Sequence, residues 1–306
     1  NVTFNADKVE GAGNLSLSGG ILTVDVSEES SSEVNPYSGV LSNLSLNKQG
    51  VGMLKLSGAN TYTGTTTISA GTLSVTGSLG RLNSSRYTYA GNIANSGTLA
   101  MGSSSDQTLS GVISGTGALT KSGSGTLTLS GTNTYTGDTT ISAGTLAVSS
   151  NNALGTVDGG TTVSNNAMLK ISGGITVAEP ITINGSGVSS NGAIYFLSGN
   201  NTYSGAITLG SNSTITSDAG NQTISGTING AYTLGIAAAG DWTQSGIVGG
   251  STPLTGYSID AGSNNIILAA SSTVAGDINI LAPTSSGAVT INSGIITATG
   301  DNRTIV

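Results

Sequence analysis

Apolar side chains occupy every second position in short runs along the chain. Leu54 and Leu56 form one such pair, and Leu127 and Leu129 form another. A period of two places the apolar side chains on one face of a β-strand. Ser-Gly, Thr-Gly and Ala-Gly dipeptides interrupt these runs, as turns between strands do. The pattern therefore predicts an all-β protein built from short strands.

One long unit occurs twice in the chain with few changes. Gly52–Val75 reads GMLKLSGANTYTGTTTISAGTLSV and Gly125–Val148 reads GTLTLSGTNTYTGDTTISAGTLAV, with 19 of the 24 positions identical. A fainter third copy, LSGNNTYSG, spans Leu197–Gly205. Long-period self-similarity indicates a solenoid, in which equivalent sequences occupy equivalent coils. A sandwich or barrel would have to place near-identical copies in non-equivalent positions.

The repeat predicts a parallel β-helix in which the offset between copies corresponds to about three coils, if each coil takes about 20–25 residues. Leu56 and Leu129 should then point inward at equivalent positions. We expect a single β-solenoid domain over residues 1–306. Its predicted parts are N-terminal coils with an acidic loop (1–36), a repeat region (37–155), a degenerate repeat region (156–230) and C-terminal coils (231–306).

The pattern LxLSGxNTYTGxTTISAGTLxV, preceded by K-x-G-x-G, resembles the β-strand repeats of bacterial autotransporter passengers. The match covers residues 37–80 and 109–155, with a remnant at 191–210. The resemblance implies a right-handed parallel β-helix (β-solenoid) that is extracellular or lies at the bacterial cell surface. It does not imply one activity, because such passengers include adhesins, proteases, esterases and structural surface proteins. No secretion signal opens the chain at Asn1, so we expect any such signal to have been removed or to lie outside this sequence.

Composition narrows the possible partners and chemistry. Charged residues make up 8% of the chain and hydrophobic residues 36%, and the alternating runs favour a folded core over disorder. The net charge is −7 with eight scattered basic residues, so nucleic acid and anionic lipid are not expected as partners. The longest apolar stretch, Gly235–Gly240, is too short for membrane insertion. The absence of cysteine excludes disulfides and fits an exported protein.

Catalytic motifs are weak. The chain has no histidine, which excludes a Ser-His-Asp triad and histidine-based metal sites. Ser45-Leu46-Asn47-Lys48 spells S-x-x-K, but it lies between a strand and a glycine turn rather than on a helix, so we interpret it as coincidence. Glycan hydrolysis needs converging carboxylates. The aspartates are instead dispersed in predicted turns, where we expect them to cap backbone groups: Asp106, Asp138, Asp158, Asp218, Asp241, Asp260 and Asp277.

Three possible binding features have a structural explanation that we favour, and a fourth stays open. The cluster Asp25, Glu28, Glu29 and Glu33 could bind Ca²⁺ but reads as a solvated loop. The paired Asn and Tyr of each repeat could bind a sugar by hydrogen bonding and ring stacking. We interpret them instead as a repeated structural corner, in which Asn caps the turn and Tyr packs over the edge of the coil. The pairs are Asn60 and Tyr62, Asn133 and Tyr135, and Asn201 and Tyr203. Thr65–Thr67 could contribute to a lattice-binding threonine ladder, but only two such segments exist. Trp242 could be a surface contact residue or a coil cap, and the sequence does not decide between them.

We therefore expect a non-enzymatic surface scaffold or adhesin-type passenger, with no catalytic, cofactor-binding or metal-binding residues. One alternative is a filament subunit that assembles by end-to-end strand stacking, and a second is a polysaccharide-acting enzyme. Gly287–Gly300 and Asn1–Phe4 carry neither charge nor proline, and unprotected strand edges recruit other strands. The expected partners are further copies or neighbouring passenger segments end to end, and surface glycans or proteins of host or neighbouring cells.

Overall fold

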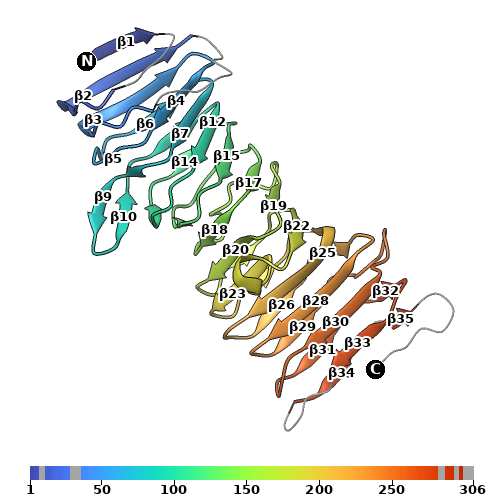
Figure 1. The fold of residues 1–306 in the computed structure, drawn as a ribbon. Coiled ribbons are helices and arrows are strands. Elements are labelled where there is room, and N and C mark those ends of the chain that lie inside the picture. Colours follow the sequence, from blue (N-terminus) through green and yellow to red (C-terminus); the bar gives the residue numbers. More distant parts are fainter. Residues whose placement is uncertain (7–10, 28–35, 282–286, 293–295, 299–306) are drawn as a thin grey trace. The chain divides into compact units, whose positions relative to one another are not determined.

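The computed structural model describes residues 1–6, 11–27, 36–281, 287–292 and 296–298. This part of the chain is all-β, with one short 3-10 turn, η1 (Val188–Ser190). The strand pairings whose register is described are parallel, apart from one hairpin, which confirms the predicted parallel β-solenoid. Two compact units divide the chain, Asn1–Ala147 with Asn152–Gly159 and Val148–Asn151 with Gly160–Val306. Figure 1 shows the strands of each unit stacked coil upon coil.

Three columns of stacked strands form the first unit. The first column is β1 (Val2–Ala6), β2 (Leu15–Val26), β3 (Leu41–Gln49), β6 (Thr66–Ile68), β11 (Ile93–Asn95) and β14 (Ile113–Ser114). The second is β4 (Met53–Leu56), β7 (Thr72–Val75), β12 (Thr98–Met101), β15 (Ala118–Lys121) and β17 (Thr139–Ile141). The third contains β10 (Arg86–Tyr89), β13 (Gln107–Leu109), β16 (Thr126–Leu129) and β18 (Gly144–Val148). Shorter strands are β5 (Ala59–Asn60), β8 (Ser78–Leu79) and β9 (Arg81–Asn83).

The second unit repeats this arrangement. Its first column is β19 (Thr161–Val163), β22 (Ile181–Gly185), the start of β25 (Ile207–Ser217) and β27 (Ile228–Asn229). The second is β20 (Ala167–Ser172), β23 (Ile194–Ser198), the end of β25, β28 (Thr233–Ala238), β30 (Gly256–Asp260) and β33 (Ile278–Leu281). The third is β21 (Thr176–Val177), β24 (Thr202–Tyr203), β26 (Gln222–Ile224), β29 (Trp242–Gln244), β31 (Ile266–Leu268) and β34 (Val289–Ile291). β32 (Ser272–Val274) pairs with β35 (Ile296–Ala298).

In most strands, alternate residues point into the coil and form the core. Leu56 is 1% exposed and Leu129 is fully buried, which confirms that both leucines point inward. Aromatic side chains fill the wider parts of the interior. Tyr62 and Tyr89 meet edge to face with their ring centroids 5.4 Å apart. Such pairs add to the stabilisation from apolar burial.

The two repeat copies do not occupy equivalent positions, so this expectation was wrong. Leu54 begins a stack in the second column that continues, coil by coil, through Leu73, Leu99 and Leu119. Leu127, the counterpart of Leu54 in the second copy, lies in the third column instead. Three coils after Leu54 the second column reaches Leu119, and Leu127 lies on the next column after that. The second copy therefore begins three coils and one column further along the solenoid. Each column requires only alternating inward apolar side chains, so the same sequence folds on either face.

Coil stacking explains one glycine of the repeated SAGTL segment. Gly71 has φ +64°, and a Cβ atom there would lie 2.4 Å from the Gly52 carbonyl oxygen. Gly144, the same position of the second copy, has φ +67° and would place its Cβ 2.3 Å from the Gly123 carbonyl oxygen. A side chain would clash with the coil beneath in both places, and positive φ disfavours any residue except glycine.

Some sequence predictions fall outside the described residues. Glu28, Glu29 and Glu33 are among them, so the calcium and loop interpretations of the acidic cluster both stay predictions. The stretch Gly287–Gly300 is described only in part. Within it, Val289, Thr290 and Ile291 form β34 and are exposed.

Candidate functional site

The lysine of each K-x-G-x-G segment points into the coil. Lys48 Nζ donates hydrogen bonds to the carbonyl oxygens of Gln49 at 2.6 Å, Gly50 at 2.7 Å and Ala70 at 3.3 Å. Lys121 Nζ likewise binds carbonyl oxygens, including that of Ala143 at 3.0 Å. Each lysine thus ties its own turn to the following coil.

Burial changes the acidity of these two lysines. Desolvation lowers the pKa of the Lys48 and Lys121 ammonium groups to about 8, against an opposing effect of Asp25 and Asp106 respectively. Ser45, the other end of the S-x-x-K sequence, lies on the outward side of β3, whereas Lys48 lies on its inward side. The two side chains therefore point away from each other, which is incompatible with a Ser-Lys nucleophile.

The repeated asparagines are structural corners. Asn133 Oδ1 accepts the Ile113 amide at 2.8 Å, and its Nδ2 donates to the Ala153 carbonyl oxygen at 2.6 Å. These partners lie one coil before and one coil after the asparagine. Asn60 makes the corresponding bonds to the coils on both sides. Buried amides that satisfy backbone groups in this way cannot serve a ligand.

The repeated tyrosines are buried as well, so they do not form a sugar platform. Tyr62, Tyr135 and Tyr203 have no exposed surface. The Tyr135 hydroxyl bonds Thr139 Oγ1 at 2.7 Å, and the Tyr203 hydroxyl donates to the Glu179 carbonyl oxygen at 2.7 Å. Burial raises the pKa of the Tyr62 and Tyr203 hydroxyls, which keeps both neutral in the folded protein.

Trp242 belongs to the core rather than to a surface contact. Its side chain is fully buried and meets Phe196 edge to face, with centroids 6.3 Å apart. The predicted turn-capping role of aspartates holds for several positions. Asp106 Oδ1 accepts the Thr126 amide at 2.8 Å, and Asp260 Oδ1 accepts the Gly262 amide at 2.9 Å. In the described ranges, no three Asp or Glu side chains gather as a metal site would require.

Outward threonines form longer rows than the sequence indicated. Thr176, Thr202, Thr223 and Thr243 stack in consecutive coils of the second unit. Sequence comparison of whole repeats missed these rows because their members come from segments with little sequence similarity. The expectation of only two isolated threonine segments was therefore wrong.

The second unit carries a polar groove between its first two columns. One cavity of about 700 Å³ adjoins another of about 580 Å³, and both are lined by Asn165, Gly185 and Asn212. We call the combined hollow the Asn groove. Its further lining includes Asn184, Tyr232, Thr214, Gly235, Ser258, Asp277 and Asn279.

A row of small outward residues makes this groove hollow. Thr214, Gly235 and Ser258 stack in register on β25, β28 and β30. A Cβ atom on Gly235 would meet only Ser258 Oγ at 3.5 Å and Thr214 Cγ2 at 3.9 Å, so the floor lies open to solvent. A full coil of sequence separates each of these residues from the next, which is why no local motif pointed to them.

Amide groups and one aromatic ring line the groove rim. Asn212 Oδ1 accepts the Thr233 amide at 3.0 Å, and Asn184 Nδ2 donates to the Val163 carbonyl oxygen at 2.9 Å. These bonds fix both side chains while leaving the Asn212 Nδ2 and the Asn184 Oδ1 available. Tyr232 is 40% exposed, unlike the buried tyrosines of the repeats. The arrangement offers fixed donors, fixed acceptors and a flat apolar ring.

The stacked coils and inward asparagine, lysine and tyrosine corners define a class of protein: a repeat-bearing parallel β-solenoid. Residues 46–75, 119–148 and 195–212 match the passenger-associated-transport-repeat family. The chain is thus a β-solenoid with passenger-associated-transport repeats, consistent with an autotransporter passenger, and these repeats imply secretion to the cell surface or beyond. Comparison with curated proteins and with solved structures found no match. Among the described residues, no helix is long and apolar enough to cross a membrane.

Proposed function

We propose that this protein is a non-enzymatic, adhesin-type passenger that binds a neutral surface oligosaccharide in the Asn groove. The observation that carries the proposal is the exposed Tyr232 ring beside the amides of Asn212 and Asn184. Amide groups offer both donors and acceptors to sugar hydroxyls, and an aromatic face packs against the apolar face of a sugar ring.

The groove supports binding better than hydrolysis. Glycoside hydrolysis needs two carboxyl groups about 5–10 Å apart on either side of the scissile bond. Among the described residues that line the groove, Asp277 is the single carboxylate. A shallow hollow lined mainly by uncharged polar groups, with Asp277 as its one carboxylate among the described residues, suits recognition of a glycan without cleavage.

The test is a glycan-array screen with the purified chain, followed by titration of the best ligand. Tyr232→Ala should weaken binding at least tenfold, about 1.4 kcal/mol, because it removes the ring that contacts the sugar. Ile247→Ala is the matched control, since Ile247 is 48% exposed in the same unit and does not line the groove. Equal affinity of both variants would contradict the site, and release of shortened glycan products would contradict the non-enzymatic assignment.

A further inference from the structure

The hairpin of β9 and β10 departs from the coil pattern of the first unit. It makes the coil from Leu73 to Leu99 longer than the next coil, which runs from Leu99 to Leu119. Figure 1 shows the hairpin projecting to one side of the stacked strands. Its antiparallel register pairs Arg81 with Thr88, Leu82 with Tyr87 and Asn83 with Arg86.

The register gives the hairpin two chemically different faces. Side chains alternate across a strand, so Arg81 and Asn83 share one face and Leu82 lies on the other. Arg86 is opposite Asn83 and therefore joins the first face, which we call the arginine face. Arg81 and Arg86 are diagonal neighbours on this face. The Cα atoms of such neighbours lie about 7–8 Å apart, so one ligand can contact both side chains.

The arginine face concentrates the exposed positive charge of the described part of the chain. Lys48 and Lys121 are buried, as shown above. Lys55 and Lys170 are half-buried on other strands, whereas Arg81 and Arg86 are both exposed. An arginine pair is well suited to carboxylate or sulfate groups because each guanidinium offers a planar fork of N–H donors.

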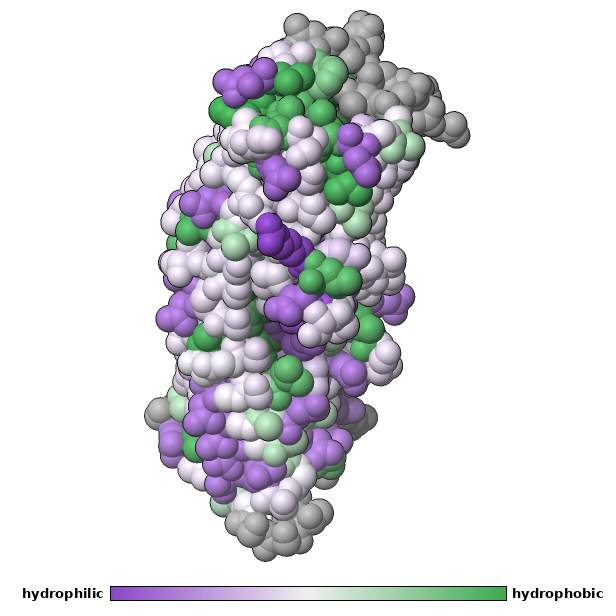
Figure 2. Space-filling model, turned by 90° about the vertical axis from the view of Figure 1, so that its left-hand side faces the viewer, coloured by the Kyte–Doolittle hydropathy of each residue, from purple (hydrophilic) through white to green (hydrophobic). Residues whose placement is uncertain are grey.

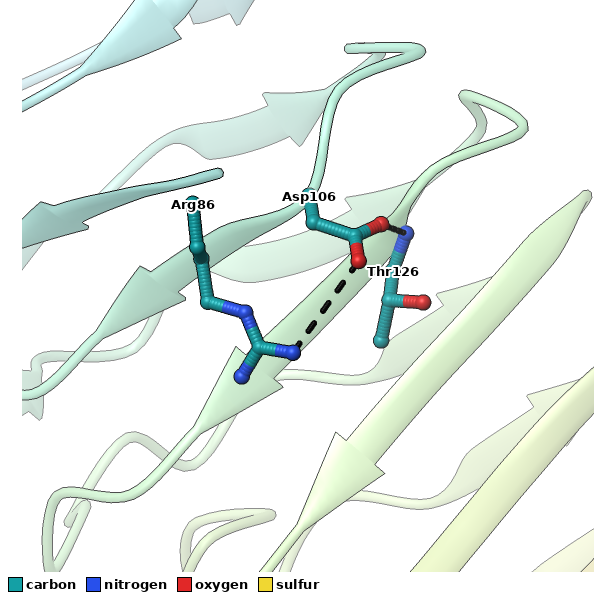
Figure 3. A network of polar contacts seen from close by, with 3 residues as sticks. All are labelled: Arg86, Asp106 and Thr126. Carbon is teal, nitrogen blue, oxygen red and sulfur yellow. Dashed lines mark hydrogen bonds and ion pairs between the residues drawn. The ribbon is translucent and has the colours of Figure 1, made fainter. Parts of the chain in front are cut away.

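Asp106 pairs weakly with Arg86 and leaves the two arginines with a net positive charge. Arg86 Nη2 lies 4.0 Å from Asp106 Oδ2, and the other carboxylate oxygen of Asp106 accepts the Thr126 amide at 2.8 Å. Figure 3 shows Arg86 on β10, Asp106 just before β13 and Thr126 at the start of β16. Both charged side chains are nearly half exposed, and an exposed ion pair of this kind contributes at most about 1 kcal/mol. The remaining guanidinium donors of Arg86 stay available to a ligand.

A row of hydroxyl groups continues the arginine face along the solenoid. Thr88 stacks on Thr108 and Thr108 on Thr128, all pointing outward from the third column. In the described structure, the hydroxyl groups of these three threonines have no side-chain hydrogen-bond partner. Stacked strands lie about 4.8 Å apart, so the hydroxyl groups follow one another at this spacing. Figure 2 shows one face of the molecule, on which pale, weakly polar side chains predominate.

We propose that the arginine face and the Thr88–Thr108–Thr128 row together bind an anionic glycan. The carboxylate or sulfate groups of the glycan contact Arg81 and Arg86, and its hydroxyls contact the threonine row. This site lies in the first unit and is independent of the Asn groove. A densely charged nucleic acid is a poor alternative, because phosphate recognition draws on many basic contacts and this chain carries a net charge of −7.

The experiment titrates the purified chain with oligogalacturonate, sulfated dextran and neutral dextran at low ionic strength. We expect at least one anionic probe to bind at least tenfold more tightly than neutral dextran, with affinity that falls as salt is added. The comparison of the two anionic probes distinguishes carboxylate from sulfate recognition. Binding of neither anion at millimolar concentration, or equal binding of neutral dextran, would overturn the proposal.

Matched variants separate the site from overall charge. Arg81→Gln with Arg86→Gln should weaken anion binding at least tenfold. Lys55→Gln with Lys170→Gln removes the same charge from other strands and should leave affinity unchanged. Arg86→Lys should have an intermediate effect, because an ammonium group lacks the planar fork. An equal loss in the lysine and arginine double variants would show non-specific attraction and refute the site.

Thr108→Val with Thr128→Val tests the hydroxyl row while keeping both arginines. This variant should weaken binding of the oligosaccharides severalfold and leave binding of a small anion such as acetate or sulfate unchanged. Oligosaccharide affinity equal to that of the unmodified chain would exclude the threonine row from the site. Circular dichroism of every variant checks that the strands are retained.

Discussion

Asn133→Ala should destabilise the first unit by much more than the few side-chain atoms it removes would suggest. The asparagine is 1% exposed and links three coils through the Ile113 amide and the Ala153 carbonyl oxygen. Alanine leaves both backbone groups buried without a partner. Each unsatisfied buried group costs about 1–3 kcal/mol, so the expected loss in the free energy of unfolding is about 2–6 kcal/mol.

The preceding backbone amide provides a matched control. The Val112 amide is also bonded to an asparagine, Asn92 Oδ1, at 3.0 Å. Asn92 is exposed, so water replaces its oxygen in Asn92→Ala. We expect a loss below about 1 kcal/mol there, because the bond exchanges for one to solvent. The two variants thus differ in burial while acting on consecutive amides.

Urea denaturation compares the two variants, and native-state hydrogen exchange localises the effect. Stacked coils open locally as well as globally, so Ile113 should exchange faster in Asn133→Ala even where the global transition is broad. The Val112 amide should exchange faster in Asn92→Ala with little change in the denaturation midpoint. A loss in Asn133→Ala that is below about 1 kcal/mol, or no larger than that of Asn92→Ala, would refute the role assigned to the corner.

Four further outcomes are expected. Leu129→Ala should cost about 2–5 kcal/mol in urea denaturation, because it leaves a cavity in a closed core, and a loss below about 1 kcal/mol would contradict that packing. Stability should rise between about pH 8 and pH 10, because Lys48 and Lys121 lose their protons at about pH 8 when folded but near their ordinary value when unfolded. Stability should fall above about pH 10, because the buried tyrosine hydroxyls, such as Tyr89 with its pKa raised to about 12, ionise first in the unfolded chain. Urea denaturation across this pH range measures both effects, and a free energy of unfolding that does not change with pH would contradict both the lysine and the tyrosine argument. We expect copies of the chain to assemble end to end through β34 at high concentration, and Thr290→Pro should then reduce light scattering, because proline removes a strand donor from β34. A parent that stays monomeric, or a variant that assembles equally well, would disprove that contact.

Local sequence determined the strands and the corners of this protein. Alternation at Leu54 and Leu56 predicts one buried face whatever the neighbouring coil contains, because the period of a strand is a local property. The repeated asparagine and tyrosine were correctly interpreted as structural, since a corner used twice in one solenoid has to satisfy the same backbone groups each time. The family match covers these same residues.

Stacking between coils decided the features that local sequence could not. The coils that begin at Leu54, Leu73 and Leu99 differ in length, and together they shift the second repeat copy onto another face. The same stacking builds the floor of the Asn groove and the threonine row beside the arginine face. Outward side chains have no core to constrain them, so their sequence carries no period that reveals which residues become neighbours. Only the length of each coil sets that register, and coil length depends on how each turn and hairpin packs in three dimensions.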